Sequence, residues 1–154
     1  MNSLDTLYKE IILDHNKSPR NFGPLKDAEI SREGFNPLCG DRIRLEVKLG
    51  PDRKSIEHCG FTGTGCSICM ASASIMTEEM EGASLAKADE AIDHFRALVM
   101  GEKDPSVDMS EEVDALSGVR NFPVRIKCAL LAWHTLRDAL LSREGAGKNV
   151  TRTE

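Results

Sequence analysis

The chain has 154 residues, of which 40% are hydrophobic and 29% are charged, with a formal net charge of −5 at pH 7. This length supports one domain with a hydrophobic core, and the acidic balance argues against a protein that binds nucleic acid. No apolar run is long enough to cross a membrane, and the charged N-terminal stretch has no signal-peptide cleavage site, so we expect a cytoplasmic protein.

The first part of the chain predicts one helix followed by a β-hairpin. Apolar residues at helical spacing predict an amphipathic helix over residues 3–15, and the prolines and glycine of "NKSPRNFGPL" end it. Polar and apolar side chains alternate along residues 42–49, "RIRLEVKL", which predicts a half-buried strand. "GPDRK" then predicts a turn, and "SIEHCGF" predicts the antiparallel partner strand.

The second part of the chain predicts helices only. The glycine-rich link "GTG" leads to a predicted helix over residues 67–81, which Gly82 ends. A further helix is predicted over residues 84–100, and residues 111–117 predict a short helical segment. The last long helix is predicted over residues 123–143, because its first residue is a proline, which is favoured at that position.

This order of elements indicates the fold class. Strands grouped early and helices grouped late are typical of an α+β fold. The sequence contains no internal repeat, so we predict a single domain over residues 4–143. Residues 145–154, "GAGKNVTRTE", predict a disordered tail.

Five cysteines in a cytoplasmic chain are more typical of metal ligands, catalytic thiols or buried side chains than of disulfides. Cys39 lies in the loop "NPLCGD", two residues before Asp41. Cys66 lies at the start of a predicted helix, where free N–H groups and the helix dipole favour a thiolate. Cys128 lies on the last helix and is predicted to border the core. If the fold brings these groups together, three sulfurs and one oxygen would suit tetrahedral Zn²⁺.

The other two cysteines are predicted to be buried. Cys59 is in phase with Phe61 along its strand, and Cys69 shares a helical stripe with three apolar residues, Ala73, Met76 and Met80. Cys66 and Cys69 also form a C-x-x-C pair, for which a thioredoxin-like redox function is the alternative. That motif needs a βαβ context, which the preceding hairpin does not supply.

Three separated motifs, "NPLCGD", "FTGTGCSICMASAS" and "RIKCALLAW", resemble the IscU/NifU-N scaffold family of iron–sulfur cluster assembly. "LYKEIILDHNKSPRNFG" resembles the N-terminal signature of that family, and the resemblance covers residues 4–141. Lys127 stands where the IscU branch has a histidine ligand, and residues 83–115 resemble the extra segment of the SufU branch, the zinc-dependent sulfurtransferases of the SUF pathway. The implied fold is the SufE/IscU-like α+β sandwich, a small antiparallel sheet packed by helices.

The resemblance also implies a metal site and a function. The implied metal ligands are Cys39, Asp41, Cys66 and Cys128. The implied function is zinc-dependent sulfur transfer, with a pyridoxal-phosphate cysteine desulfurase of the SufS type as sulfur donor and the SUF cluster-assembly complex downstream. This sequence departs from the family at Cys69, where a serine is expected, so an alternative ligand or a resolving thiol stays open.

The position of Cys39 predicts which ligand accepts sulfur. Cys39 lies on a loop between turn-forming residues, whereas Cys66 and Cys128 are held by helices. We therefore expect Cys39 to leave the metal and become the persulfide acceptor. Arg125 lies three residues before Cys128 on the same side of the helix. It could offset the charge of the site or hold a departing thiolate, and a surface ion pair is the alternative.

Two other functions stay open. The same residues could hold a nascent [2Fe–2S] cluster, because thiolates ligate such clusters, although Lys127 removes the usual fourth ligand. Alternatively, zinc could be purely structural in an adaptor domain, although the oxygen ligand Asp41 is untypical of closed structural sites.

Overall fold

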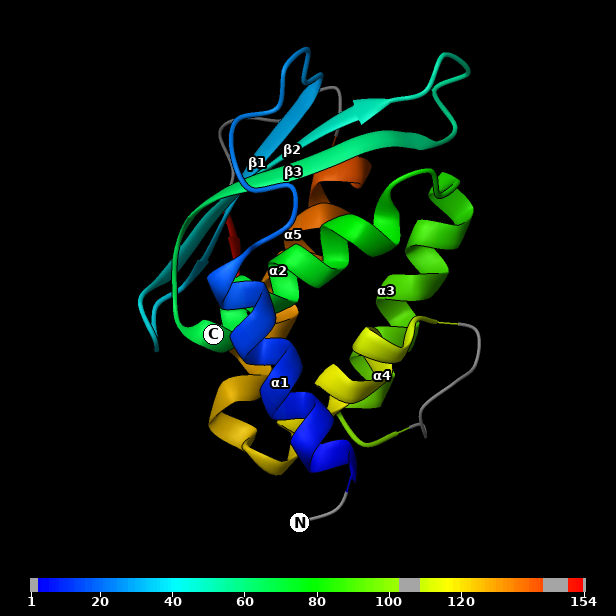
Figure 1. Ribbon diagram of the computed structural model, residues 1–154. Coiled ribbons are helices and arrows are strands. Elements are labelled where there is room, and N and C mark those ends of the chain that lie inside the picture. The colour runs from blue at the N-terminus through cyan, green and yellow to red at the C-terminus, as the bar shows by residue number, and fades with distance from the viewer. Residues whose placement is uncertain (1–2, 103–108, 143–149, 154) are drawn as a thin grey trace.

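The computed structural model describes residues 3–102, 109–142 and 150–153, and it shows a sheet with helices packed on one face (Figure 1). The elements in chain order are α1 (Ser3–Lys17), β1 (Ile30–Asn36), β2 (Asp41–Leu49), β3 (Ile56–Thr64), α2 (Ser67–Met80), α3 (Leu85–Val99), α4 (Glu111–Leu116), the 3₁₀ turns η1 (Ser117–Asn121) and η2 (Pro123–Arg125), α5 (Ile126–Leu141) and β4 (Val150–Arg152). No helix in these parts of the chain is long and apolar enough to span a membrane.

The sheet has the strand order β3-β2-β1-β4. β2 pairs antiparallel with both β1 and β3, whereas β4 runs parallel to β1. The sheet is therefore mixed, and the prediction of a purely antiparallel sheet is wrong at this edge. The β1–β2 register places Asn36 opposite Asp41, immediately beside the turn that carries Cys39.

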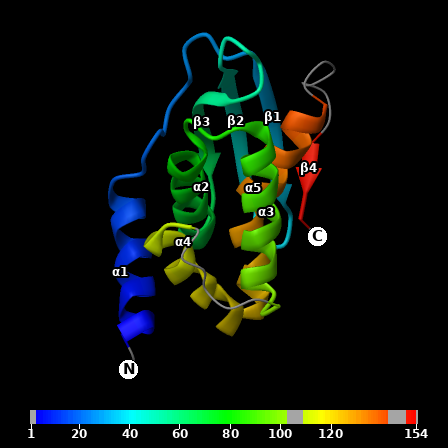
Figure 2. The same cartoon turned by 90° about the vertical axis from the view of Figure 1, so that its right-hand side faces the viewer.

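Two helices, α2 and α5, form the layer that covers the sheet, while α1 packs on the outer side of α2 and α3 packs against α5 (Figure 2). Phe95 of α3 stacks on Trp133 of α5 with ring centroids 4.2 Å apart. The Trp133 indole N–H donates to Ser72 Oγ of α2 at 2.9 Å, and that hydroxyl donates to the Ala129 carbonyl. All four residues are fully buried, so this network fixes the packing of the three helices.

Most of the predicted elements are confirmed, with small shifts at their ends. The helices predicted over residues 3–15, 67–81, 84–100 and 111–117 are α1, α2, α3 and α4, and the predicted hairpin is β2–β3. The last helix differs, because residues 123–125 form a 3₁₀ turn in which the Ile126 N–H donates to the Pro123 carbonyl. The α-helix begins only at Ile126.

Strand β1 was not predicted, and its buried face explains why. Ile30, Arg32, Gly34 and Asn36 form the face turned toward the helices. Three of these four residues are polar or lack a side chain, so the alternation of apolar and polar residues that identifies a half-buried strand is missing.

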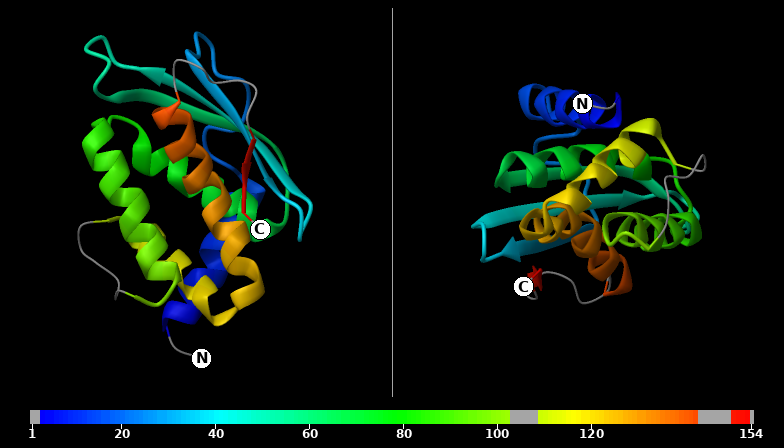
Figure 3. Two further views of the ribbon diagram at one scale, coloured as in Figure 1. Left: turned by 180° about the vertical axis from the view of Figure 1, so that it is seen from behind. Right: turned by 90° about the horizontal axis from the view of Figure 1, so that it is seen from below.

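The C-terminal strand corrects the prediction of a disordered tail. Residues 150–152 form β4, which lies along the edge of the sheet beside β1 (Figure 3), while residues 145–149 and 154 lie outside the described residues. Thr151 Oγ1 accepts a hydrogen bond from Arg32 Nε at 2.6 Å and donates to Asp138 Oδ2 at 2.7 Å. Because Arg32 is 9% exposed, this contact supplies an acceptor for its buried Nε–H, while its other guanidinium nitrogens contact Ser142 and Asp138.

Replacing Thr151 with valine should lower the free energy of unfolding by about 1–3 kcal/mol, because the buried Arg32 N–H loses its acceptor. Chemical denaturation of the variant and the parent protein measures this difference. Thr153→Val is the matched control, since Thr153 Oγ1 is equally buried and has no hydrogen-bond partner among the described residues. Equal losses in the two variants would contradict the role assigned to the Thr151 hydroxyl.

Candidate metal centre

Three segments that are distant in sequence meet at one end of the sheet, where the β1–β2 turn lies beside the first turns of α2 and α5 (Figure 1). They carry Cys39, Cys66 and Cys128, respectively, and Asp41 lies at the start of β2. All five cysteines of the chain are free thiols. The fold therefore brings together the four residues that the family resemblance implies as ligands.

Asp41 connects the strand to the helix. Its Oδ1 accepts a hydrogen bond from the backbone N–H of Cys66 at 2.8 Å, and its Oδ2 accepts one from Asn36 Nδ2 at 3.1 Å. Asp41 and Asn36 are both fully buried. The carboxylate is thus held in one orientation by a strand on one side and a helix N-terminus on the other.

Asn36 is a residue of this centre to which the sequence analysis assigned no role. Its Nδ2 donates to Cys128 Sγ at 3.3 Å as well as to Asp41, while its Oδ1 is buried without a hydrogen-bond partner among the described residues. No signal in the sequence marked this role, because the strand that buries Asn36 was itself not predicted. Side chains that orient metal-binding groups in this way contribute strongly to metal affinity.

The sulfur atoms lie close to one another and to the carboxylate. Cys128 Sγ is 3.2 Å from Cys39 Sγ, and Cys66 Sγ is 4.0 Å from Asp41 Oδ2. The Sγ atoms of Cys39 and Cys128 and a carboxylate oxygen of Asp41 all lie within 4.8 Å of one another. Cys66 Sγ lies outside this group, although it accepts a hydrogen bond from Cys128. Arg125 Nη1 donates to Cys39 Sγ at 3.4 Å, so the charge partner predicted from the sequence contacts the loop cysteine directly.

The side chains of this candidate centre differ in exposure. Cys39 is half-buried on a turn whose neighbours Leu38 and Gly40 are exposed, with Leu38 64% exposed. Gly40 has a φ of +72°, a conformation that strongly favours glycine and lets the chain reverse immediately after Cys39. Cys128 was predicted to border the core but is fully buried, because the turn and Asn36 cover it.

The electrostatics of the cluster favour a thiolate at Cys66. A hydrogen bond from Cys128 is the largest cause that lowers the pKa of Cys66 to about 6, and the backbone N–H groups of Cys69 and Ile68 add to it. Cys66 is the N-cap of α2, as the sequence predicted, and its Sγ accepts from the Cys69 N–H. Conversely, the hydrogen bond to Cys66 and then burial raise the pKa of Cys128.

The donor set fits a zinc ion. Tetrahedral coordination with Zn–S bonds of about 2.3 Å places neighbouring sulfurs about 3.8 Å apart. The Cys39–Cys128 separation of 3.2 Å needs only a small outward movement to reach this value. Three thiols and one carboxylate, of which all but Cys39 lie on or directly beside a helix or strand, are therefore suited to hold Zn²⁺.

A second group of side chains that could bind a metal, on α1 and α4, does not belong to this centre. Asp14, His15 and Glu112 also lie within 4.8 Å of one another, but Asp14 pairs with Arg20, and both His15 ring nitrogens are bonded, one to Ser74 and one to Glu112. These contacts tie α1 to α2 and α4 and account for the cluster.

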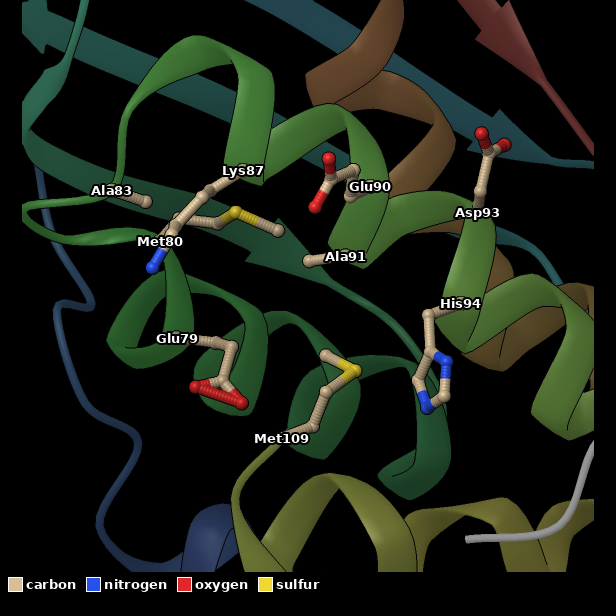
Figure 4. A pocket seen from close by; sticks show the side chains of 9 residues that line it. All are labelled: Glu79, Met80, Ala83, Lys87, Glu90, Ala91, Asp93, His94 and Met109. Carbon is tan, nitrogen blue, oxygen red and sulfur yellow. The ribbon is translucent and has the colours of Figure 1, made fainter. Parts of the chain in front are cut away.

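A cavity of about 640 Å³ lies between α2 and α3 and is lined by no cysteine (Figure 4). Its lining is mainly acidic and apolar, with Glu79, Glu90 and Asp93 around Met80 and Met109.

Comparison with known protein families identifies the domain. The sequence model of the family "NifU-like N terminal domain" matches residues 7–129. The chain belongs to this family. It is 46% identical over 144 residues to the zinc-dependent sulfurtransferase SufU of Bacillus subtilis, covering 93% of this chain and 95% of that protein. It is 39% identical to the iron–sulfur cluster assembly scaffold protein IscU of Streptococcus pyogenes, covering 91% of this chain and 86% of that protein.

Solved structures support the same assignment. A candidate iron–sulfur cluster assembly scaffold protein of the SUF system from Fervidobacterium islandicum is 31% identical, with a TM-score of 0.79, covering 90% of this chain and 99% of that chain. The resemblance to the IscU/NifU-N family and the α+β fold, both inferred from the sequence, are therefore confirmed. The similar proteins place this NifU-like domain among iron–sulfur cluster assembly proteins.

In the metal-free protein, alkylation of Cys66 should follow an apparent pKa of about 6, and Cys128→Ala should raise that pKa toward its usual value. The reason is that the variant removes the hydrogen bond that stabilises the Cys66 thiolate. Alkylation rates as a function of pH, resolved by peptide mass spectrometry, measure the shift. Cys59 is the internal control, because burial raises its pKa to about 12 and it should not react in the folded protein. An unchanged Cys66 profile in Cys128→Ala would contradict this account.

Proposed function

We propose that this NifU-like domain transfers sulfur during iron–sulfur cluster assembly, taking persulfide sulfur onto Cys39 at a zinc centre formed by Cys39, Asp41, Cys66 and Cys128. The convergence of these residues from three distant segments carries the proposal. The similarity to a protein named as a zinc-dependent sulfurtransferase supports zinc as the metal.

The bound ion would keep its thiol ligands deprotonated and would not oxidise them, because zinc has no redox chemistry of its own. The chain provides the rest of the chemistry. Cys39 lies on a half-buried turn, whereas Cys128 is fully buried and Cys66 is anchored as a helix N-cap. Cys39 is thus the sulfur that can leave the centre with the least rearrangement of the fold.

The transfer step is a thiolate exchange. The Cys39 thiolate attacks the terminal sulfur of a donor persulfide, the S–S bond of the donor breaks, and the donor cysteine leaves as a thiolate. No electrons enter or leave the system. Arg125, which donates to Cys39 Sγ, would stabilise the negative charge on this sulfur as it moves away from the other ligands.

The donor that fits this chemistry is a pyridoxal-phosphate cysteine desulfurase of the SufS type, acting in the cytoplasm, and the SUF cluster-assembly complex would receive the sulfur. Exposed apolar side chains lie next to the reactive groups in sequence, with Leu38 beside Cys39 and Val124 beside Arg125. Leu38 is 64% and Val124 63% exposed, as expected of a surface that a protein partner covers.

A scaffold that holds a [2Fe–2S] cluster on the same residues is the second candidate, because relatives at 39% and 36% identity are named as cluster assembly scaffolds. Lys127, at the position expected of an additional ligand, is exposed. Purified protein that is colourless and contains one zinc would support sulfur transfer. Brown protein containing iron at the same residues would support the scaffold instead.

Cys39→Ser should abolish the uptake of labelled sulfur from a cysteine desulfurase and the stimulation of alanine production by that enzyme. The reason is that a serine hydroxyl cannot form a persulfide. Cys59→Ala is the control, because Cys59 is a buried thiol on β3, paired with Val47 rather than with a residue of the centre. Wild-type sulfur uptake by Cys39→Ser would refute Cys39 as the acceptor.

Arg125→Gln should slow sulfur uptake by about fivefold while leaving the zinc content unchanged, because Arg125 contacts Cys39 from an exposed position where such interactions are weak. Arg120→Gln makes the same chemical change at an exposed position of η1 and should leave the rate unaltered. Single-turnover transfer from a preloaded desulfurase gives both rates. Identical rates in the two variants would remove Arg125 from the transfer step.

A further inference from the structure

Two sulfur atoms of the candidate centre lie almost in contact, which is a hazard for a protein that carries sulfur. Cys128 Sγ is 3.2 Å from Cys39 Sγ. When the turn that bears Cys39 returns to this position with a persulfide, a second sulfur nucleophile lies beside the new S–S bond. Thiolates attack such bonds readily, so the carried sulfur survives only if Cys128 is kept unreactive.

The unwanted step is an internal exchange of sulfur bonds. The Cys128 thiolate attacks Cys39 Sγ, and the bond from Cys39 Sγ to the outer sulfur breaks. The outer SH group leaves as hydrosulfide with both electrons of that bond, and a Cys39–Cys128 disulfide forms. No outside oxidant or reductant takes part, because a persulfide already has the oxidation level of a disulfide. The carried sulfur would be lost to solvent as sulfide.

Asn36 contacts the Cys128 sulfur directly. Its Nδ2 donates to Cys128 Sγ at 3.3 Å and to Asp41 Oδ2 at 3.1 Å. All three residues are fully buried, so water does not compete for either contact. These two acceptors fix the orientation of the amide, because the reverse orientation would place Oδ1 against a carboxylate and a sulfur.

The other end of the Asn36 amide shows that this orientation has a cost. Asn36 Oδ1 is buried without a hydrogen-bond partner among the described residues. A buried acceptor that is left unsatisfied destabilises the folded state, and an apolar side chain of similar size would avoid that penalty. The polar residue at this position is therefore explained by what its N–H groups do at the centre.

We propose that Asn36 protects the sulfur carried by Cys39, by holding the Cys128 thiolate in a hydrogen bond that lowers its nucleophilicity. This inference rests on the proposed function. A thiolate ligand of zinc stays deprotonated whatever side chains surround it, so protonation does not silence Cys128 in the occupied centre. The N–H donor instead draws charge from the sulfur and must be displaced before a lone pair can attack. Asn36 acts through Cys128 and is thus a positioning residue.

The neighbouring sulfur receives a different donor. Arg125 Nη1 donates to Cys39 Sγ at 3.4 Å from an exposed position, where a long side chain can follow the turn as it moves. Asn36 lies on β1 and is fully buried, so its donor stays with Cys128. The two adjacent sulfurs therefore differ in their hydrogen-bond donors, which suits Cys39 to carry sulfur and Cys128 to remain in place.

The test compares the parent protein with Asn36→Leu, which has a similar volume and no N–H donor. Both are loaded by a cysteine desulfurase, separated from it and from free cysteine without oxygen, and incubated with excess zinc so that the centre stays occupied. The Cys39 persulfide should disappear about tenfold faster in Asn36→Leu, the effect of removing one hydrogen bond to a charged atom. Mass spectrometry should show a Cys39–Cys128 disulfide, and an equal amount of sulfide should be released.

Asn16→Leu is the matched control. Asn16 Nδ2 also donates to two acceptors, the carbonyls of Ile12 and Ser67, each at 2.8 Å, so it joins α1 to the start of α2, and neither acceptor is a sulfur. This variant should keep the persulfide lifetime of the parent protein. Asn36→Ser is a second, smaller change, whose hydroxyl is too short to reach Cys128, and it should lose sulfur as Asn36→Leu does.

A persulfide that lives as long in both Asn36 variants as in the parent protein would overturn the inference. Equally rapid loss in Asn16→Leu would also overturn it, because a general loosening of the centre would then explain the result. A disulfide that contains Cys66 or Cys69 in place of Cys128 would do the same.

These outcomes are separable from failure of the proposed function. If the parent protein takes up no sulfur on Cys39, the proposed function fails. If the parent protein holds a stable persulfide on Cys39 and the Asn36 variants hold it equally well, only the protecting role of Asn36 is wrong.

Discussion

The hydrogen bond between the Asp41 carboxylate and the backbone N–H of Cys66 is the contact on which the centre depends. It joins the start of β2 to the start of α2, and it fixes a buried negative charge at a helix N-terminus, where the dipole and the free N–H groups stabilise it. Asn36 completes the arrangement by donating to both Asp41 and Cys128, so one side chain on β1 sets the relative positions of two donors. Without these contacts, a fully buried carboxylate would be strongly destabilising.

This constraint separates fixed donors from one that can move. Asp41, Cys66 and Cys128 are held by a strand and two helices, whereas Cys39 is held only by a short turn and by contacts to Cys128 and Arg125. A site built to store zinc would gain from fixing all four donors equally. The asymmetry instead suits a centre in which one sulfur exchanges while the others stay.

The sequence predicted the elements whose burial follows a regular period and failed where polar residues take buried positions. The α1, α2 and α3 helices and the β2–β3 hairpin follow from apolar periodicity. β1 and β4 were missed because their buried positions carry Arg32, Asn36 and Thr151, which are stabilised by partners far away in the sequence. The convergence of the cysteines also depends on tertiary structure, since only the family motifs linked them beforehand. Asn36 was overlooked for the same reason as β1.

Residues around the centre become more exposed from its interior to its rim. This order of exposure affects how the Cys39 sulfur could be transferred to a partner. Cys128 and Asp41 are fully buried, Cys39 is half-buried, and Arg125 and the neighbouring Leu38 and Val124 are exposed. A partner that covers the apolar rim would remove water from Cys39 and Arg125 only at the moment of docking. Since electrostatic interactions strengthen when water is excluded, the weak contact between Arg125 and the Cys39 sulfur would become strong at the moment of the proposed transfer, when the thiolate leaves the other donors. The free protein would therefore keep its sulfur ligand in place, and the partner would supply the low-dielectric surroundings that favour its departure.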